Sequence, residues 1–218
     1  LGGGTVVLWL VPEGPFRSRG SRPKMGSLRQ IFRHAGFRDA ASGYFGHMWE
    51  LYTFWAFVPV MLQAYAERHQ VQMLNMPLWS FACIAIGGPA CVLGGYLSRG
   101  GGAKKIATLA LFISGLCCLA WPLVFLQGSL VLFLAFMLTW GAAVVADSPL
   151  FSTLVAQHAP AESRGTALTL VVCIGFAITI VSIQLVNLLQ AIAPPTWLYM
   201  VLAAGPVLGL RALVQKSG

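Results

Sequence analysis

Charge is scarce in this sequence, and acidic residues are the scarcest. Charged residues make up 9% of the 218 residues, with only six Asp and Glu, whereas apolar residues make up 57%. A soluble globular domain carries about a quarter charged residues. The apolar residues form long continuous runs, without the alternation over about ten residues that marks a barrel strand. Since lipid offers the backbone no hydrogen-bond partner, such runs must be helices. The composition therefore excludes a soluble domain and predicts an all-α integral membrane protein.

Motifs for metal binding and catalysis are also lacking. The five cysteines lie inside apolar runs, without metal-ligand spacing, and no H-E-x-x-H motif occurs. We interpret the cysteines as small buried packing residues and expect no metal, no cofactor and no enzymatic activity. An integral membrane enzyme or metal-dependent membrane protein that uses His47, Glu50 and Asp147 is an alternative.

The first 42 residues are predicted to form two parts. Residues 1–12 are apolar but too short for a span, which needs about 20 residues, and they lack the basic start of a signal peptide. We interpret them as the end of a truncated transmembrane helix. Residues 13–42 form a basic cytoplasmic loop with an interfacial helix. The apolar residues of that helix have helical spacing: Leu28, Ile31, Phe32 and Ala35.

Six transmembrane helices are predicted in the remaining chain, as a six-helix domain over residues 43–213 with a cytoplasmic tail at 214–218. The loops between them are short, as in a compact helical bundle. The predicted spans are residues 43–65, 76–98, 106–126, 130–155, 166–192 and 195–213.

The basic residues predict the orientation of these spans. Thirteen Lys and Arg fall on one side of the predicted topology and only Arg68 on the other. The positive-inside rule makes the basic side cytoplasmic, with both ends of the domain on that side of a cell membrane. Aromatic residues near the opposite span ends agree with this orientation: Tyr65, Trp79, Trp121, Trp197 and Tyr199. The net charge of +8 then follows from topology and does not indicate nucleic-acid binding.

Ionisable residues inside the predicted spans are few. They are His47 and Glu50 in the first span and Asp147 in the fourth, with no Lys or Arg. A charge at mid-bilayer costs at least about 2.5–3.5 kcal/mol, so such residues need a partner or a water-filled cavity. His47 and Glu50 share a helix face. We expect Glu50 to bind a proton or cation with His47 tuning it, or else to form a structural His–Glu hydrogen bond. Asp147 contacts substrate in one interpretation. In the other, its carboxylate is bonded to the helix backbone that Pro149 frees or to a cytoplasmic arginine.

Two tryptophans, Trp55 and Trp140, lie midway along their spans. They are candidates for stacking on a substrate, with packing against neighbouring helices as the alternative. Helix breakers occur in several spans and are typical of transporter helices that line a pathway. They are Pro59, Gly87-Gly88-Pro89, Pro122, Pro149 and Gly205-Pro206.

Three segments resemble the C-terminal half of the major facilitator superfamily. Residues 94–105 (GGYLSRGGGAKK) resemble the glycine-rich basic loop between the eighth and ninth helices, with Ser98 where the fuller motif has an aspartate. Residues 160–167 (PAESRGTA) resemble the loop before the eleventh helix, and residues 43–50 (GYFGHMWE) the start of the seventh.

The resemblance implies a secondary transporter that moves a small solute by alternating access between two six-helix halves. Proton coupling, symport and antiport are all compatible with it. It implies that His47, Glu50, Asp147, Trp55 and Trp140 lie toward a substrate or proton pathway. It also implies a gating loop, formed by Gly95, Arg99, Lys104 and Lys105. The partners would be the lipid bilayer, a solute and an N-terminal six-helix half or second copy. A stand-alone six-helix subunit that dimerises is an alternative. Because the spans hold no Lys or Arg, a neutral, apolar or cationic solute is favoured over an anion.

Overall fold

The computed structural model describes residues 5, 9, 10, 31–72 and 74–215. The predicted helix end at residues 1–12 and most of the loop at 13–42 therefore lie outside the described residues. Of the predicted interfacial helix, Ile31 is buried, Phe32 and Ala35 are half-buried, and Arg33 is exposed. Ala35 already begins the first long helix.

Helices make up nearly all of the described chain, and no strand occurs within it. In order they are α3 (Ala35–His69), α4 (Met76–Ala85), α5 (Gly87–Gly101), α6 (Ala103–Leu126), α7 (Leu130–Ala146), α8 (Ser148–His158), η1 (Ala161–Ser163), α9 (Arg164–Gln190), α10 (Pro195–Leu198), η2 (Tyr199–Ala203) and α11 (Ala204–Val214). The prediction of an all-α membrane protein is confirmed.

Five helical segments of the described chain are long and apolar enough to cross a membrane. They are Met76–Gly101, Ala103–Leu126, Leu130–His158, Ala161–Gln190 and Pro195–Val214. They match five of the predicted spans, with ends shifted by at most a few residues.

The remaining predicted span, 43–65, falls within α3, which has 35 residues but a lower apolar content than the other five. At ~1.5 Å per residue its length suffices to cross a bilayer. Three polar side chains within this span turn inward, since His47, Glu50 and Thr53 are all at most 1% exposed. A helix in the middle of a bundle can carry polar groups that a lipid-facing helix cannot.

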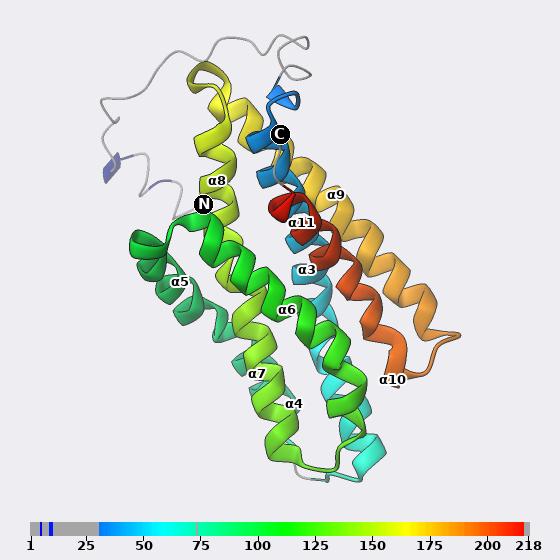
Figure 1. The fold of residues 1–218 in the computed structure, drawn as a ribbon. Helices are drawn as coiled ribbons and strands as arrows, with labels where there is room; N and C mark the ends of the chain where they lie inside the picture. Colours follow the sequence, from blue (N-terminus) through cyan, green and yellow to red (C-terminus); the bar gives the residue numbers. More distant parts are fainter. Residues whose placement is uncertain (1–4, 6–8, 11–30, 73, 216–218) are drawn as a thin grey trace.

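Helix α3 occupies the centre of the bundle, where α11, α9, α8, α4 and α7 pack around it (Figure 1). The start of α3 and the end of α11 lie at the same end of the bundle (Figure 1). The turn between α5 and α6 lies at that end too, so the basic residues of this turn and of α11 gather there.

Glycines allow α3 and α11 to approach closely. A Cβ at Gly46 would overlap the carbonyl oxygen of Gly205, and a Cβ at Gly205 would overlap the carbonyl oxygen of Gly46. Gly209, four residues after Gly205, lies against Gly43. The GxxxG spacing therefore works as such motifs do in membranes, where small residues bring two backbones together.

Three of the predicted helix breakers end a helix, and two do not. Ile86 separates α4 from α5, Asp147 separates α7 from α8, and the 3-10 segment η2 precedes α11. Pro59 and Pro122, by contrast, remain inside α3 and α6. Only the break between α7 and α8 contains a predicted site residue, Asp147.

Candidate functional site

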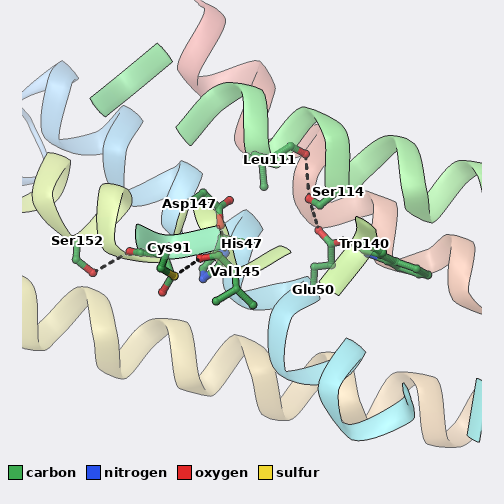
Figure 2. A network of polar contacts seen from close by, with 10 residues as sticks. His47, Glu50, Cys91, Leu111, Ser114, Trp140, Val145, Asp147 and Ser152 are labelled. Atoms are coloured by element: carbon green, nitrogen blue, oxygen red, sulfur yellow. Dashed lines mark hydrogen bonds and ion pairs between the residues drawn. The ribbon is translucent and has the colours of Figure 1, made fainter. Parts of the chain in front are cut away.

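The carboxyl group of Glu50 is the centre of a buried polar cluster. Its Oε1 accepts hydrogen bonds from Trp140 Nε1 at 2.6 Å and from Cys118 Sγ at 3.2 Å. Its Oε2 lies 2.9 Å from Ser114 Oγ (Figure 2). Trp140 belongs to α7 and the other two to α6, so one side chain of α3 is bound to two further helices. Glu50 is fully buried, and the low dielectric around it strengthens each of these bonds.

Ser114 gives this cluster two ways to arrange its protons. Its hydroxyl lies within hydrogen-bond distance of Glu50 Oε2 and also of the Leu111 carbonyl oxygen, at 3.1 Å (Figure 2). A hydroxyl has one proton to donate but can also accept. It can donate to an ionised Glu50, or it can donate to Leu111 and accept a hydrogen bond from a neutral Glu50. The cluster is therefore satisfied in both protonation states of the carboxyl.

Packing holds the Trp140 indole in its donating position. Trp140 is fully buried, and its ring lies 4.8 Å from Phe54 and 5.7 Å from Phe136, measured between ring centroids. Aromatic pairs at such separations add stability beyond the area they bury. Within the described chain, the Trp140 ring thus packs against neighbouring rings, while its N–H donates to Glu50.

His47 and Asp147 form a second buried pair, one turn of α3 away. His47 Nδ1 lies 2.8 Å from Asp147 Oδ1, and the two residues are 1% and 0% exposed. The sequence suggests Glu50 as the partner of His47, but the carboxylate that His47 contacts is that of Asp147. The side chains leave α3 in slightly different directions, and α8 lies opposite His47. Among the described residues, His47 Nε2 and Asp147 Oδ2 have no hydrogen-bond partner.

The helix break next to Asp147 has a clear cause. Pro149 has no N–H, so the carbonyl of Val145, four residues earlier, loses its helical partner. The thiol of Cys91 in α5 donates to that carbonyl instead, at 3.3 Å (Figure 2). A side chain of a neighbouring helix thus satisfies the carbonyl that Pro149 leaves without a partner, and the Asp147 carboxylate beside this break contacts His47.

The cysteines are more varied than the sequence suggests. Cys83, Cys117 and Cys118 are buried, but Cys91 is half-buried and Cys173 is exposed. Cys91 and Cys118 also donate hydrogen bonds at the two polar sites. Sequence reasoning missed these two donors and Ser114, because a cysteine or serine in an apolar run has no pattern that separates a hydrogen-bond donor from a packing residue.

Trp55 belongs to a separate group of aromatic side chains. It is half-buried, and its ring lies 5.4 Å from that of Tyr52, which in turn lies 5.4 Å from Phe176 of α9. Its buried Nε1 has no partner among the described residues. The five predicted pathway residues are therefore divided between the Glu50 cluster, the His47–Asp147 pair and this aromatic group.

The predicted gating loop lies almost wholly within helices. Gly95 and Arg99 belong to α5, and Lys104 and Lys105 to α6, with Gly102 as the single residue between the helices. Gly102 has a φ of +81°, a conformation that favours glycine. The Ser98 hydroxyl donates to the Gly95 carbonyl of its own helix, at 2.8 Å.

Five apolar helical segments long enough to cross a membrane pack around α3, and ionisable side chains are hydrogen-bonded in the interior of the described chain. Together they define a polytopic membrane protein with a buried polar site. Within the described range, no group of three or more His, Cys, Asp or Glu side chains is arranged to hold a metal ion. The family model for the Major Facilitator Superfamily matches residues 1–183. The chain belongs to this superfamily and is a membrane transporter. No match was found among curated protein sequences.

Proposed function

We propose that this protein is a secondary active transporter that moves a small solute by alternating access, and that Glu50 binds the coupling proton. The observation that carries the proposal is the Glu50 cluster, a fully buried carboxyl with partners on two other helices. An ionised carboxylate is costly at such a depth in a membrane unless it is paired. A group that is satisfied both with and without its proton can load and release one.

Proton binding would change how α3 is held in the bundle. The ionised carboxylate accepts three hydrogen bonds, and bonds to charged groups are about twice as strong as neutral ones. The neutral acid makes weaker bonds with Trp140 and Cys118 and donates to Ser114. The proton therefore loosens the contacts of α3 with α6 and α7. Any ligand that favours one of two conformations shifts the equilibrium between them, and the proton is such a ligand here.

The transported solute is proposed to be neutral, apolar or cationic. Among the described membrane helices, His47 is the group that could supply positive charge deep in the bundle, and it contacts Asp147. Tyr52, Trp55 and Phe176 supply aromatic surface at the side of α3 that faces α9. Aromatic rings bind apolar groups through their area and cations through their faces.

A second six-helix bundle is proposed to complete the pathway, either as another part of a longer chain or as a second copy. Large apolar residues are exposed on several helices of this bundle, among them Val92 of α5 at 75% and Ile180 of α9 at 63%. Transporters with two halves enclose their solute between them. We place the basic end of the bundle in the cytoplasm and keep Gly95, Arg99, Lys104 and Lys105 as the proposed gating segment.

The first experiment tests proton coupling with a panel of candidate solutes. The full-length protein is reconstituted into liposomes that contain a trapped pH-sensitive dye, and neutral and cationic compounds are added outside one at a time. A transported compound is expected to change the internal pH with wild-type protein. Glu50→Gln is expected to abolish that change, whereas Glu67→Gln, at an exposed position of the same helix, retains it. A Glu50→Gln protein with unchanged proton movement would refute the role of Glu50.

A second measurement examines proton binding directly. Infrared difference spectra of the reconstituted protein, recorded across a pH series, report the carbonyl stretch of protonated carboxylic acids. We expect a titrating band that disappears in Glu50→Gln and shifts in Ser114→Ala, because Ser114 is the proposed hydrogen-bond partner of the neutral acid. A titrating band that is identical in all three proteins would assign the proton to another residue.

A further inference from the structure

An open groove lies between α6 and α11 at the basic end of the bundle. Its volume is about 1180 Å³. The two helices are neighbours in the bundle, and the turn between α5 and α6 closes the end of the groove. Its lining includes residues of two kinds, three cationic side chains near the bundle end and apolar side chains deeper along the helices.

The cationic residues are Lys104 and Lys105 on α6 and Arg211 on α11, all of them exposed. In the portion of the chain that the structure describes, no ion pair involves any of the three. Three like charges that line one groove repel each other, and an anion placed among them relieves that repulsion. The groove thus has a site for a negatively charged group at its mouth.

The deeper wall of the groove is apolar and belongs to membrane-spanning helices. Leu109 and Phe112 of α6 are 52% and 48% exposed, and Val207 of α11 is 39% exposed. Both helices lie in segments that are apolar enough to cross a membrane. Acyl chains are the natural cover for such a surface, because apolar side chains and lipid tails have similar polarity.

We propose that this groove binds an anionic phospholipid, with its phosphate between Lys104, Lys105 and Arg211 and its acyl chain along Leu109, Phe112 and Val207. A small solute pocket usually measures about 300–1,000 Å³ and encloses its ligand, whereas this groove is larger and open. The combination of a cationic mouth and an apolar floor matches an amphipathic ligand with a negative head. Anionic lipids are abundant in the cytoplasmic leaflet, on the side to which basic residues are directed.

The test compares lipids that differ only in their head groups. The full-length protein in detergent is titrated with phosphatidylglycerol or phosphatidylcholine with identical oleoyl chains, and bound lipid is counted by native mass spectrometry. We expect preferential retention of phosphatidylglycerol. Since each basic residue near an anionic head group contributes about fivefold in affinity, Lys104→Gln/Lys105→Gln should weaken phosphatidylglycerol binding about 25-fold. Arg164→Gln, which removes an exposed charge at the start of α9, is the matched control and should bind as wild type does.

Two further measurements separate a lipid site from its alternatives. Leu109→Trp, at an exposed position of the groove wall, should lose retention of both lipids if an acyl chain lies there. Glycerol 3-phosphate, which has the phosphate without the chains, should not compete at concentrations that exceed the lipid by about a hundredfold. Equal retention of both lipids, an unaffected Leu109→Trp protein, or competition by glycerol 3-phosphate would each overturn the proposal.

Discussion

Glu50 and His47 leave α3 one turn apart, yet the two buried side chains have different surroundings. Glu50 has hydrogen-bond donors for both carboxyl oxygens, from α6 and α7. His47 and Asp147 have each other, with one nitrogen and one oxygen left without a partner among the described residues. Buried polar groups that are fully bonded make a structure rigid, and a buried polar atom without a partner is costly in a low dielectric. The first site is the one proposed to bind a proton, and the second is a buried pair beside a helix break whose hydrogen bonds are incomplete within the described chain.

Removal of the Glu50 carboxyl should lower stability more than any other single change at these two sites. Glu50→Ala leaves the Trp140 N–H and the Cys118 thiol buried without an acceptor, while Ser114 still has the Leu111 carbonyl. Each unsatisfied buried group costs about 1–3 kcal/mol, so we expect a loss of about 3 kcal/mol in the free energy of unfolding. Unfolding by SDS in mixed micelles measures it. Gln63→Ala, at an exposed position of the same helix, should change stability by less than about 0.5 kcal/mol.

The His47–Asp147 pair should show a smaller effect and a clear coupling. His47→Ala and Asp147→Ala each leave one buried group without its partner, and each should cost about 1–2 kcal/mol. The double variant should cost less than the sum of the two, with a coupling energy of about 1 kcal/mol, because it removes both members. The same SDS unfolding assay, run on all four proteins, gives this cycle. Strict additivity would mean that the 2.8 Å contact adds nothing to stability.

The weakest donor in the Glu50 cluster should matter least. Thiols are poor hydrogen-bond donors, and the Cys118 bond is the longest of the three, at 3.2 Å. We expect Cys118→Ala to lower the free energy of unfolding by about 0.5–1 kcal/mol, much of it from the lost sulfur volume. Cys117→Ala is the matched control, because Cys117 is also buried and precedes it in the chain. Equal losses for the two variants would show that the thiol bond to Glu50 contributes little.

Much of the architecture could be predicted from the sequence because the bilayer acts on each segment separately. A run of about 20 apolar residues must become a helix in lipid, whatever its neighbours are. Five of the six predicted spans therefore match the structure within a few residues. The segment 43–65 is harder to classify, since its polar residues lower its apolar content and only the bundle around α3 makes them tolerable.

The candidate site could be predicted only in part. Its three ionisable residues can be recognised in the sequence because charges are rare inside spans. The hydrogen-bond partners of these residues cannot be recognised in this way. Cys118 and Ser114 have no distinguishing spacing relative to Glu50, from which they lie more than 60 residues away in the chain. Helical spacing places His47 and Glu50 on one face of α3. It cannot predict that His47 contacts Asp147, just before α8, or that Glu50 accepts hydrogen bonds from α6 and α7.

The sequence by itself determined the class of protein, the approximate number and position of its helices, and the residues too polar to face lipid. These properties follow from local chemistry, the transfer of each side chain and each backbone group from water to hydrocarbon. The tertiary structure alone decided which polar groups meet, that Trp140 holds a carboxylate, that a cysteine replaces the hydrogen bond lost at Pro149, and that three cations line one groove. These contacts depend on how each helix is rotated about its axis and packed against its neighbours. Many weak contacts along the helices together determine that packing.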